Sequence, residues 1–356
     1  MNALILYPGI HNFNYNIFSE TSENSISAGK IDNYRDFEYE KLAQIASSHK
    51  INAIIVRVIF GGDKFDKPVL ADSHVIQMLE QLIPYAPLHL PGAIRLINAC
   101  SEIFEGLPIV LVFETAFFAS LPQREYLYGI DPELSGKKGL RRFGCHGIYH
   151  QAACAKVSSK LRGKKITCPH RIISICLDDK SDVVAIKGRK SLMITEGATP
   201  LEGLPGRTSC GDIDPSIVLT LAEKLKYSAE EVNSILTKHS GLLGLTGKDT
   251  NVKEILISDK KDFAMANDIF KYKLLNSCGA AMAAMGGADA IVFSGKYADA
   301  GKDLGDFLTQ NLTLAAVNIS NKLECYFQTD PIEKFIFDTA ANTLKQSCDK
   351  QASSCA

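Results

Sequence analysis

Two short runs contain side chains that could do chemistry. One is a cysteine followed by a histidine, and the other is a group of three aspartates. Cys145 is followed directly by His146, and a thiol beside an imidazole is the pair used in thiol catalysis. Adjacent residues of a strand point in different directions, so these neighbours are not expected to share the required hydrogen bond. Asp178, Asp179 and Asp182 could hold a hard cation, but no EF-hand spacing follows, and a solvated turn is the favoured interpretation.

Apolar runs and helical patterns alternate around these residues. Strands are expected at residues 3–6, 14–20, 25–31, 53–58, 109–113, 171–177, 183–187 and 290–294. Helices are expected at residues 39–49, 75–82, after Pro91, 150–161, 215–240 and 263–285. The last of these should end at Gly286-Gly287, and its small residues could pack in a core or in a subunit contact. The alternation of strands and helices places the chain in the α/β class.

Length and composition limit the function classes. A chain of 356 residues favours two domains, expected at 1–150 and 151–356, with a last helix that could return to the first. The net charge of −1 is spread without a basic block, which argues against nucleic acid as a partner. No apolar run has the length of a membrane span or a signal peptide, so a cytoplasmic protein is expected. Ten scattered cysteines indicate thiols in a reducing compartment.

Seven blocks together resemble the acetate kinase family. They are VRVIFGGDKF (56–65), APLHLPGA (86–93), VFETAFFASLP (112–122), LRRFGCHGIYHQ (140–151), TPLEGLPGRTSCGDIDP (199–215), SGLLGLTG (240–247) and GGADAIVFSG (286–295). The blocks keep the family's order and span most of the chain, so the sequence is identified as a member of this family. The resemblance implies a two-lobed actin/hexokinase-type fold of acetate and sugar kinases, with an interlobe cleft. It also implies transfer of the γ-phosphoryl group of ATP to acetate with Mg²⁺.

The resemblance assigns a carboxylate-binding role to several retained residues. Arg57 stands at the position of the family's substrate-carboxylate arginine, and a guanidinium can meet a carboxylate with two hydrogen bonds. The apolar wall of the acyl pocket corresponds to Ile59, Leu88 and Pro200. His89 matches another family histidine, followed here by a leucine where the family usually has asparagine.

The catalytic positions are partly changed relative to the family. His146 matches the histidine that stabilises the transferring phosphoryl group, and Glu114 replaces the aspartate of the FDTAFH-like run. The essential arginine of the TRSGDIDP-like run is replaced by Ser209, while Arg207 lies two positions earlier and could swing in. Glu114, His146 and Arg207 are therefore the catalytic candidates.

The nucleotide-side signatures are replaced more extensively. Residues 7–14 stand at an NAGSSSLK-like signature and lack its metal-side asparagine, serines and lysine. Residues 176–182 bring three carboxylates to a glycine-rich HLGNGAS-like turn, where they would repel a polyphosphate. At the GGIGEN-like run only Gly295 remains, and Asp299 stands for the metal-side glutamate. Gly295 and Asp299 are the nucleotide candidates, and Glu114 and Asp299 are the Mg²⁺ candidates.

Two functions of different classes follow from this pattern. The favoured hypothesis is a binding or scaffold protein that retains a small-carboxylate pocket and has little or no phosphotransferase activity. The alternative is an active, divergent acetate or short-chain carboxylate kinase. Family members close an aromatic ring over the acyl tail where this chain has Cys145, so we expect a carboxylate larger than acetate. The family pairs through its second lobe, so a homodimer is expected, with residues 279–287 in the interface or inside the lobe.

Overall fold

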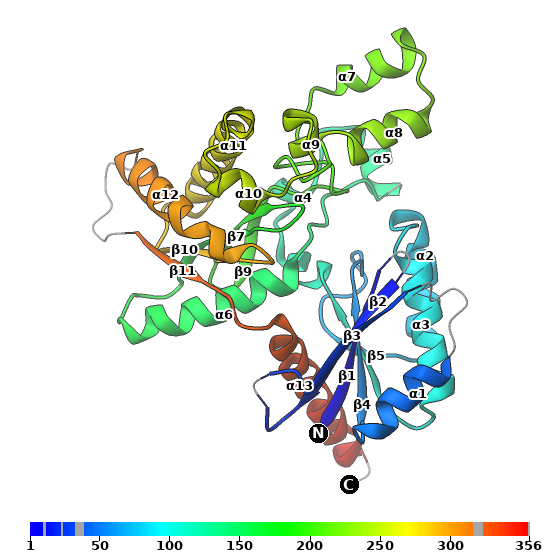
Figure 1. Cartoon of the computed structure of the whole chain (residues 1–356). Helices are drawn as coiled ribbons and strands as arrows, with labels where there is room; N and C mark the ends of the chain where they lie inside the picture. Colours follow the sequence, from blue (N-terminus) through cyan, green and yellow to red (C-terminus); the bar gives the residue numbers. More distant parts are fainter. Residues whose placement is uncertain (10–11, 23, 33–38, 138, 316–322, 355–356) are drawn as a thin grey trace. The chain divides into compact units, whose positions relative to one another are not determined.

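Two sheets, each covered by its own helices, organise the chain in the computed structural model (Figure 1). One unit comprises Met1–Ala119 and Asp330–Ala356, and the other comprises Ser120–Thr329. The structure describes residues 1–9, 12–22, 24–32, 39–137, 139–315 and 323–354. The boundary expected at 150/151 falls within the second unit, inside helix α6 (Gly147–Gly163).

The first unit is built on a sheet whose central strands are apolar and buried on both faces. Its six-stranded sheet has the order β3-β2-β1-β4-β6-β5. The strands are β1 (Asn2–Pro8), β2 (Asn12–Ser19), β3 (Ser27–Asp32), β4 (Ala53–Val58), β5 (Val69–Leu70) and β6 (Ile109–Phe113). The helices are α1 (Tyr39–Ser48), α2 (Ser73–Leu82), α3 (Leu90–Ile103) and α13 (Ile332–Ser354), with 3₁₀ turns at Ile83–Tyr85 and Thr115–Ser120.

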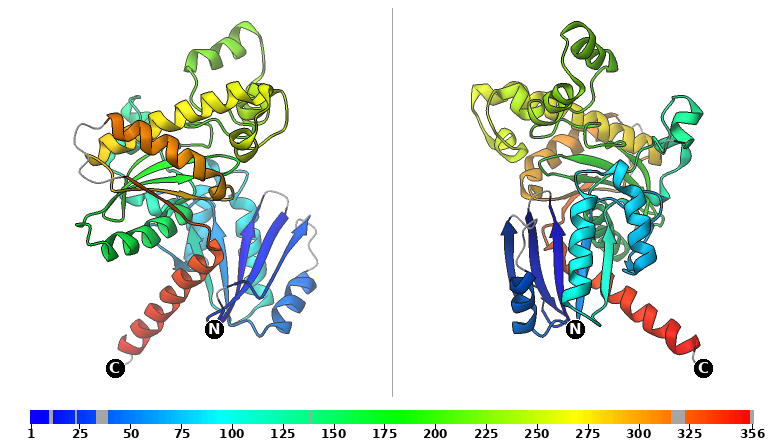
Figure 2. Two further views of the ribbon diagram at one scale, coloured as in Figure 1. Left: turned by 60° about the vertical axis from the view of Figure 1, so that its left-hand side comes forward. Right: turned by 90° about the vertical axis from the view of Figure 1, so that its right-hand side faces the viewer.

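Helices cover both faces of this sheet. Strands β1, β4 and β6 run parallel to one another, and all five residues of β6 are buried. Both α3 and α13 pack on these three strands. Figures 1 and 2 show α13 on one side of the sheet and α3 on the other. The all-apolar runs in the sequence follow from this double burial.

The second unit repeats this plan with a five-stranded sheet. Its strands, in the order β11-β10-β7-β8-β9, are β7 (Arg171–Cys176), β8 (Asp182–Lys187), β9 (Lys190–Ile194), β10 (Ala290–Ser294) and β11 (Glu324–Phe327). Its other helices are α4 (Gln123–Tyr126), α5 (Pro132–Lys137), α7 (Pro215–Leu219), α8 (Ala229–Lys238), α9 (Gly241–Thr246), α10 (Val252–Ile257), α11 (Lys261–Met285) and α12 (Gly301–Ala315). A π-helical turn at Thr220–Lys224 and a 3₁₀ turn at Ala298–Ala300 complete it.

The two sheets share one strand order along the chain. In each, the first three strands form an antiparallel meander, and the first strand pairs in parallel with the next strand after a helical crossover. Reading outward from the third strand, β3-β2-β1-β4-β6 corresponds to β9-β8-β7-β10-β11. This correspondence indicates that the two units share one structural plan.

Helix α11 contributes one face to the core of the second unit. Its buried residues recur at spacings of three or four, as on an amphipathic helix: Phe263, Ala266, Phe270, Leu274, Cys278, Ala281 and Met285. The helix ends at Gly286, whose φ of 72° is the left-handed conformation that favours glycine at a helix end. The inner face of the small-residue stretch is therefore core. Among the helices of the described residues, none has the length and apolar character needed to cross a bilayer.

Candidate functional site

Arg57 and Glu114 lie on neighbouring parallel strands of the first unit. Arg57 belongs to β4 and is paired in register with Val112 of β6, and Glu114 follows β6 directly. The Nε of Arg57 donates a hydrogen bond of 2.5 Å to Oε1 of Glu114, whose side chain is completely buried. A buried carboxylate requires a partner of opposite charge, so the pair fixes both side chains. The structure thus brings together two residues that the sequence predicted for one site.

The remaining carboxylate-side residues are divided between the two units. In the first unit Ile59 and His89 are half-buried, and Leu88 is 66% exposed. Pro200 belongs to the second unit and is exposed. A pocket that joins Pro200 to Arg57 therefore stays a prediction.

His89 gives the first unit a pH-dependent element. Its Nδ1 is buried without a hydrogen-bond partner among the described residues, and burial lowers the pKa of its imidazole. The unfolded chain therefore takes up this proton at a higher pH than the folded chain does. The neutral imidazole makes its full contribution to stability above about pH 6.5, the ordinary pKa of histidine. This contribution is lost as the pH falls toward the lower pKa that His89 has in the folded protein.

We expect His89→Gln to flatten the acid side of the stability profile. Relative to wild type, the variant should gain stability as the pH falls from 7.5 to 5. The gain per pH unit should be less than about 1.4 kcal/mol, the value for the uptake of one whole proton on unfolding. Thermal unfolding at each pH measures the difference. His74→Gln, at an exposed position of α2, is the control. Parallel wild-type and His89→Gln profiles would contradict the assignment.

A second cluster lies in the second unit, where α6 begins against the sheet. His146 caps α6, and its Nδ1 lies 3.3 Å from Oδ2 of Asp182, the first residue of β8. His150, one helical turn later, bonds Oδ1 of Asp182 through Nε2 at 2.9 Å. The Nδ1 of His150 in turn bonds the hydroxyl of Ser174 on β7 at 2.8 Å. The predicted catalytic histidine is thus held by a completely buried carboxylate.

Burial and charge act in opposite directions on the carboxyl groups of this cluster. Burial alone would raise the pKa of Asp182, but the charges and hydrogen bonds of His150 and His146 outweigh it and lower that pKa to about 2. Burial and the repulsion of Asp182 raise the pKa of Glu196 to about 8. Burial also lowers the pKa of Lys180. Groups with shifted pKa values are therefore concentrated in the cluster around His146, a pattern common at functional sites.

Sequence reasoning missed His150, Lys180 and Glu196. A usable signal existed for His150, since it lies four residues after His146, the spacing that places two side chains on one helix face. Glu196 lies just ahead of the TPLEG block, but a single glutamate there carries no periodic signal. The solvated turn expected for the acidic run is wrong for Asp182, which is completely buried because it pairs with histidines of α6.

The nucleotide-side segments of the second unit contact one another. Asp179, in the turn between β7 and β8, accepts hydrogen bonds from the hydroxyl of Tyr297 at 3.0 Å and, through its carbonyl oxygen, from the backbone N–H of Arg207 at 2.6 Å. Gly295 has a φ of 87°, and a Cβ there would lie 2.6 Å from the carbonyl oxygen of Leu177. Only glycine fits this close approach. These segments are therefore adjacent in the fold, and their role in nucleotide binding stays a prediction.

The predicted Mg²⁺ ligands are each paired with a cation. Glu114 bonds Arg57 in the first unit, and Asp299 forms an ion pair of 2.5 Å with Lys253 in the second. A Mg²⁺ site needs several oxygen ligands in octahedral geometry. Both predicted ligands are thus engaged with cations in this structure, and binding of Mg²⁺ and ATP stays a prediction.

Arg207 also has a partner of its own. Its Nε and Nη2 donate to the carboxylate of Asp249 at 2.8 and 2.6 Å, and its side chain is 41% exposed. Ser209 stands at the position of the family arginine. Ile10 and His11, from the first nucleotide signature, lie outside the described residues.

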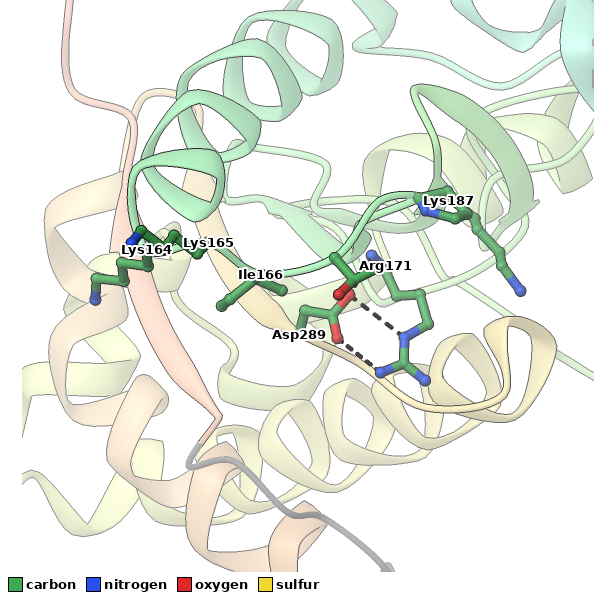
Figure 3. Close-up of a pocket in the computed structure, with 8 residues that line it drawn as sticks. Lys164, Lys165, Ile166, Arg171, Lys187 and Asp289 are labelled. Atoms are coloured by element: carbon green, nitrogen blue, oxygen red, sulfur yellow. Dashed lines mark hydrogen bonds and ion pairs between the residues drawn. The ribbon is translucent and has the colours of Figure 1, made fainter.

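A surface pocket of the second unit contains none of the predicted site residues (Figure 3). Its lining residues include Lys164, Lys165, Arg171 and Lys187. Two of these cations have carboxylate partners, because Arg171 bonds Asp289 at 2.7 Å and Lys164 bonds a glutamate of β11 at 2.5 Å. The pocket therefore has no link to the carboxylate chemistry predicted from the sequence.

Comparisons with known proteins agree with the fold and the sequence blocks. The family model of the acetokinase family matches residues 19–343. The acetate kinase of Clostridium novyi is 41% identical over 258 residues, 72% of this chain and 64% of that protein. The acetate kinase of Thermoanaerobacter pseudethanolicus is 38% identical over 267 residues, 74% of this chain and 66% of that protein. The matched region spans less than two thirds of these relatives' length.

Solved structures confirm the predicted fold class. The acetate kinase of Porphyromonas gingivalis superposes with a TM-score of 0.84 at 24% identity, covering 96% of this chain and 99% of that one. A propionate kinase of Francisella tularensis gives 0.80 at 26% identity, covering 94% and 97%. The fold is thus the two-lobed actin/hexokinase-type fold of acetate kinases. Because the family model matches most of the chain, this chain belongs to the acetokinase family.

Proposed function

We propose that this protein binds a small carboxylate through Arg57 and phosphorylates it with ATP far more slowly than an ordinary acetate kinase, or not at all. The observation that carries the proposal is the buried ion pair of Arg57 with Glu114. The pair fixes the guanidinium at the end of β4, the position of the family's carboxylate-binding arginine. A preorganised guanidinium loses little freedom on meeting a second carboxylate.

The charge distribution on the nucleotide side supports the low rate. Asp178 and Asp179 replace glycine-rich backbone in the turn after β7, and both are oriented by hydrogen bonds within the protein. Asp299 is bound to Lys253, and Arg207 is bound to Asp249. A polyphosphate would meet carboxylates where it needs N–H groups and cations.

An active carboxylate kinase is the second candidate, and one observation favours it. His146 is ordered by Asp182, which also bonds His150, so the histidine expected to contact a transferring phosphoryl group is held in place. Such ordering is a requirement for electrostatic stabilisation of a transition state. The same hydrogen bonds would also stabilise the fold of a protein that does not transfer a phosphoryl group.

The carboxylate proposal predicts a ligand effect that depends on Arg57. In a thermal-shift screen of short-chain and branched carboxylates, wild type should gain several degrees with a ligand larger than acetate, and Arg57→Ala should gain none. Arg57→Lys, which keeps a charge beside Glu114, covers the case in which the alanine variant unfolds. Arg95→Ala, at an exposed position of α3, is the control. Equal stabilisation of wild type and both Arg57 variants would refute carboxylate binding at this position.

We further propose that the protein forms a homodimer through the second unit. Four large apolar side chains within a short stretch around α7 are exposed: Ile217, Leu219, Leu225 and Tyr227. Exposed apolar patches of this kind are typical of subunit contacts. Sedimentation at micromolar concentration should give a dimer that Leu219→Asp shifts toward monomer, and a wild type that sediments only as monomer would contradict the proposal.

A further inference from the structure

Three ligand-type side chains converge in the second unit, and the carboxylate chemistry predicted from the sequence uses two of them, Cys145 and His146, but not Glu196. Cys145, His146 and Glu196 each offer one ligand atom, and these atoms lie within 4.8 Å of one another. Cys145 and His146 immediately precede α6, and Glu196 follows β9. The loop before a helix and the end of a strand thus meet at one point.

Glu196 makes this cluster unusual. Its side chain is 2% exposed, its carboxylate oxygens have no geometrically formed hydrogen bond among the described residues, and the nearby Cys145 thiol is only a weak donor. A buried carboxylate with so little compensation is costly, and buried charges in proteins are normally paired or bound to metals. The buried amine of Lys180, whose charge acts on Glu196, donates its hydrogen bond to the backbone carbonyl of Leu204 at 2.5 Å. A cation at the cluster would supply the missing partner.

His146 has the surroundings of a metal-binding histidine. Its Nδ1 bonds Asp182, and this carboxylate is held in turn by His150. A carboxylate behind a histidine fixes the ring tautomer and orientation and increases the basicity of the other nitrogen. Nε2 is therefore the atom that would bind a metal. His146 also has a left-handed φ of 54°, a strained conformation for a residue other than glycine.

We propose that Cys145, His146 and Glu196 form a three-ligand site for a divalent transition metal of the Zn²⁺ class. A thiolate and an imidazole select such a metal over Mg²⁺, and three protein ligands leave one tetrahedral position for water or a ligand. In a tetrahedral zinc site the ligand atoms lie about 3.4 to 3.6 Å apart, so the observed cluster needs small side-chain adjustments.

Charge balance favours the same assignment. A thiolate, a carboxylate and a neutral imidazole sum to two negative charges, which a divalent ion neutralises. A second grouping, His146 with Cys176 and Asp182, is less suited because both oxygens of Asp182 already bond histidines.

Cobalt titration tests the site directly. Protein dialysed against EDTA is titrated with Co²⁺, and wild type should bind one equivalent with visible d–d bands and a thiolate-to-cobalt charge-transfer band in the near ultraviolet. One equivalent of Zn²⁺ should displace the signal, and excess Mg²⁺ should not. Cys145→Ser should abolish the charge-transfer band, and Glu196→Gln should weaken cobalt binding at least tenfold.

The control is a second cysteine–histidine pair of the same unit. The thiol of Cys168, an exposed residue, lies 3.5 Å from Nε2 of His170, so Cys168→Ser removes the obvious adventitious site and should leave the spectrum unchanged. Circular dichroism of the metal-free variants establishes that they fold, with Cys145→Ala as replacement if the serine variant does not. Absence of micromolar cobalt binding by wild type, or a charge-transfer band that survives in Cys145→Ser, would overturn the proposal. The test does not depend on Arg57 or on carboxylate binding.

Discussion

Purified protein supplied with MgATP and acetate should form acetyl phosphate at least about a thousandfold more slowly than an ordinary acetate kinase, a difference of about 4 kcal/mol in activation free energy. Loss of one transition-state donor or cation typically costs about two to three orders of magnitude. Here Ser209 replaces the transition-state arginine, and Asp178 and Asp179 replace part of the glycine-rich turn. Such losses do not add fully, but we expect them together to leave little activity.

The assay measures acetyl phosphate as its hydroxamate, with an acetate kinase such as that of Clostridium novyi as the reference. Glu114→Gln distinguishes a weak intrinsic rate from contamination, because an intrinsic rate should fall in the variant and a contaminating rate should not. A turnover number on the order of 10 per second with acetate would contradict the expectation.

Asp182→Ala should be the most damaging single substitution in the second unit. The side chain is completely buried and bonds both His146 and His150, so its removal leaves two imidazoles without their shared acceptor. Breaking a buried pair by removing one partner costs about 3–5 kcal/mol. Urea unfolding, followed by circular dichroism, measures the change in free energy.

The matched control for this substitution is an exposed ion pair of the same unit. Asp262 lies 2.6 Å from Lys248 and is 63% exposed, so Asp262→Ala should cost less than about 1 kcal/mol. Asp182→Asn, which keeps the shape and one acceptor, should fall between the two. Equal losses for Asp182→Ala and Asp262→Ala would mean that the histidine cluster does not stabilise the unit.

Sequence patterns predicted the central strands and the longest helix because these elements have strong periodicity. The apolar runs at 53–58 and 109–113 became β4 and β6, and the pattern at 263–285 became α11. Strands β5, β9 and β11 and helix α12 were missed, whereas the last helix, α13, was expected without bounds. Strand β9 follows a two-residue turn in which Gly188 and Arg189 both have positive φ, a hairpin signal that only one glycine marks in the sequence. Strand β11 is four residues long and half-buried, too short for a periodic signal.

The sequence predicted those site residues that lie within the family-like blocks. It did not predict those that come together only through the fold. Arg57 and Glu114 follow from two blocks, and their contact follows from two parallel strands that end at one edge. The partnership of His146 with Asp182 depends on how α6 packs against β7 and β10, which no local pattern specifies. Glu196 joins the same cluster only through the position of β9.

The central proposal is that the protein binds a small carboxylate but not MgATP, and calorimetric titration with MgATP tests this proposal most directly. The same protein preparation is titrated with the carboxylate selected by thermal shift, which establishes that it is folded and competent. We predict saturable heat for the carboxylate and no saturable heat for MgATP up to about 1 mM, a binding free energy weaker than about −4 kcal/mol. Saturable MgATP binding with a Kd in the micromolar range would contradict the account.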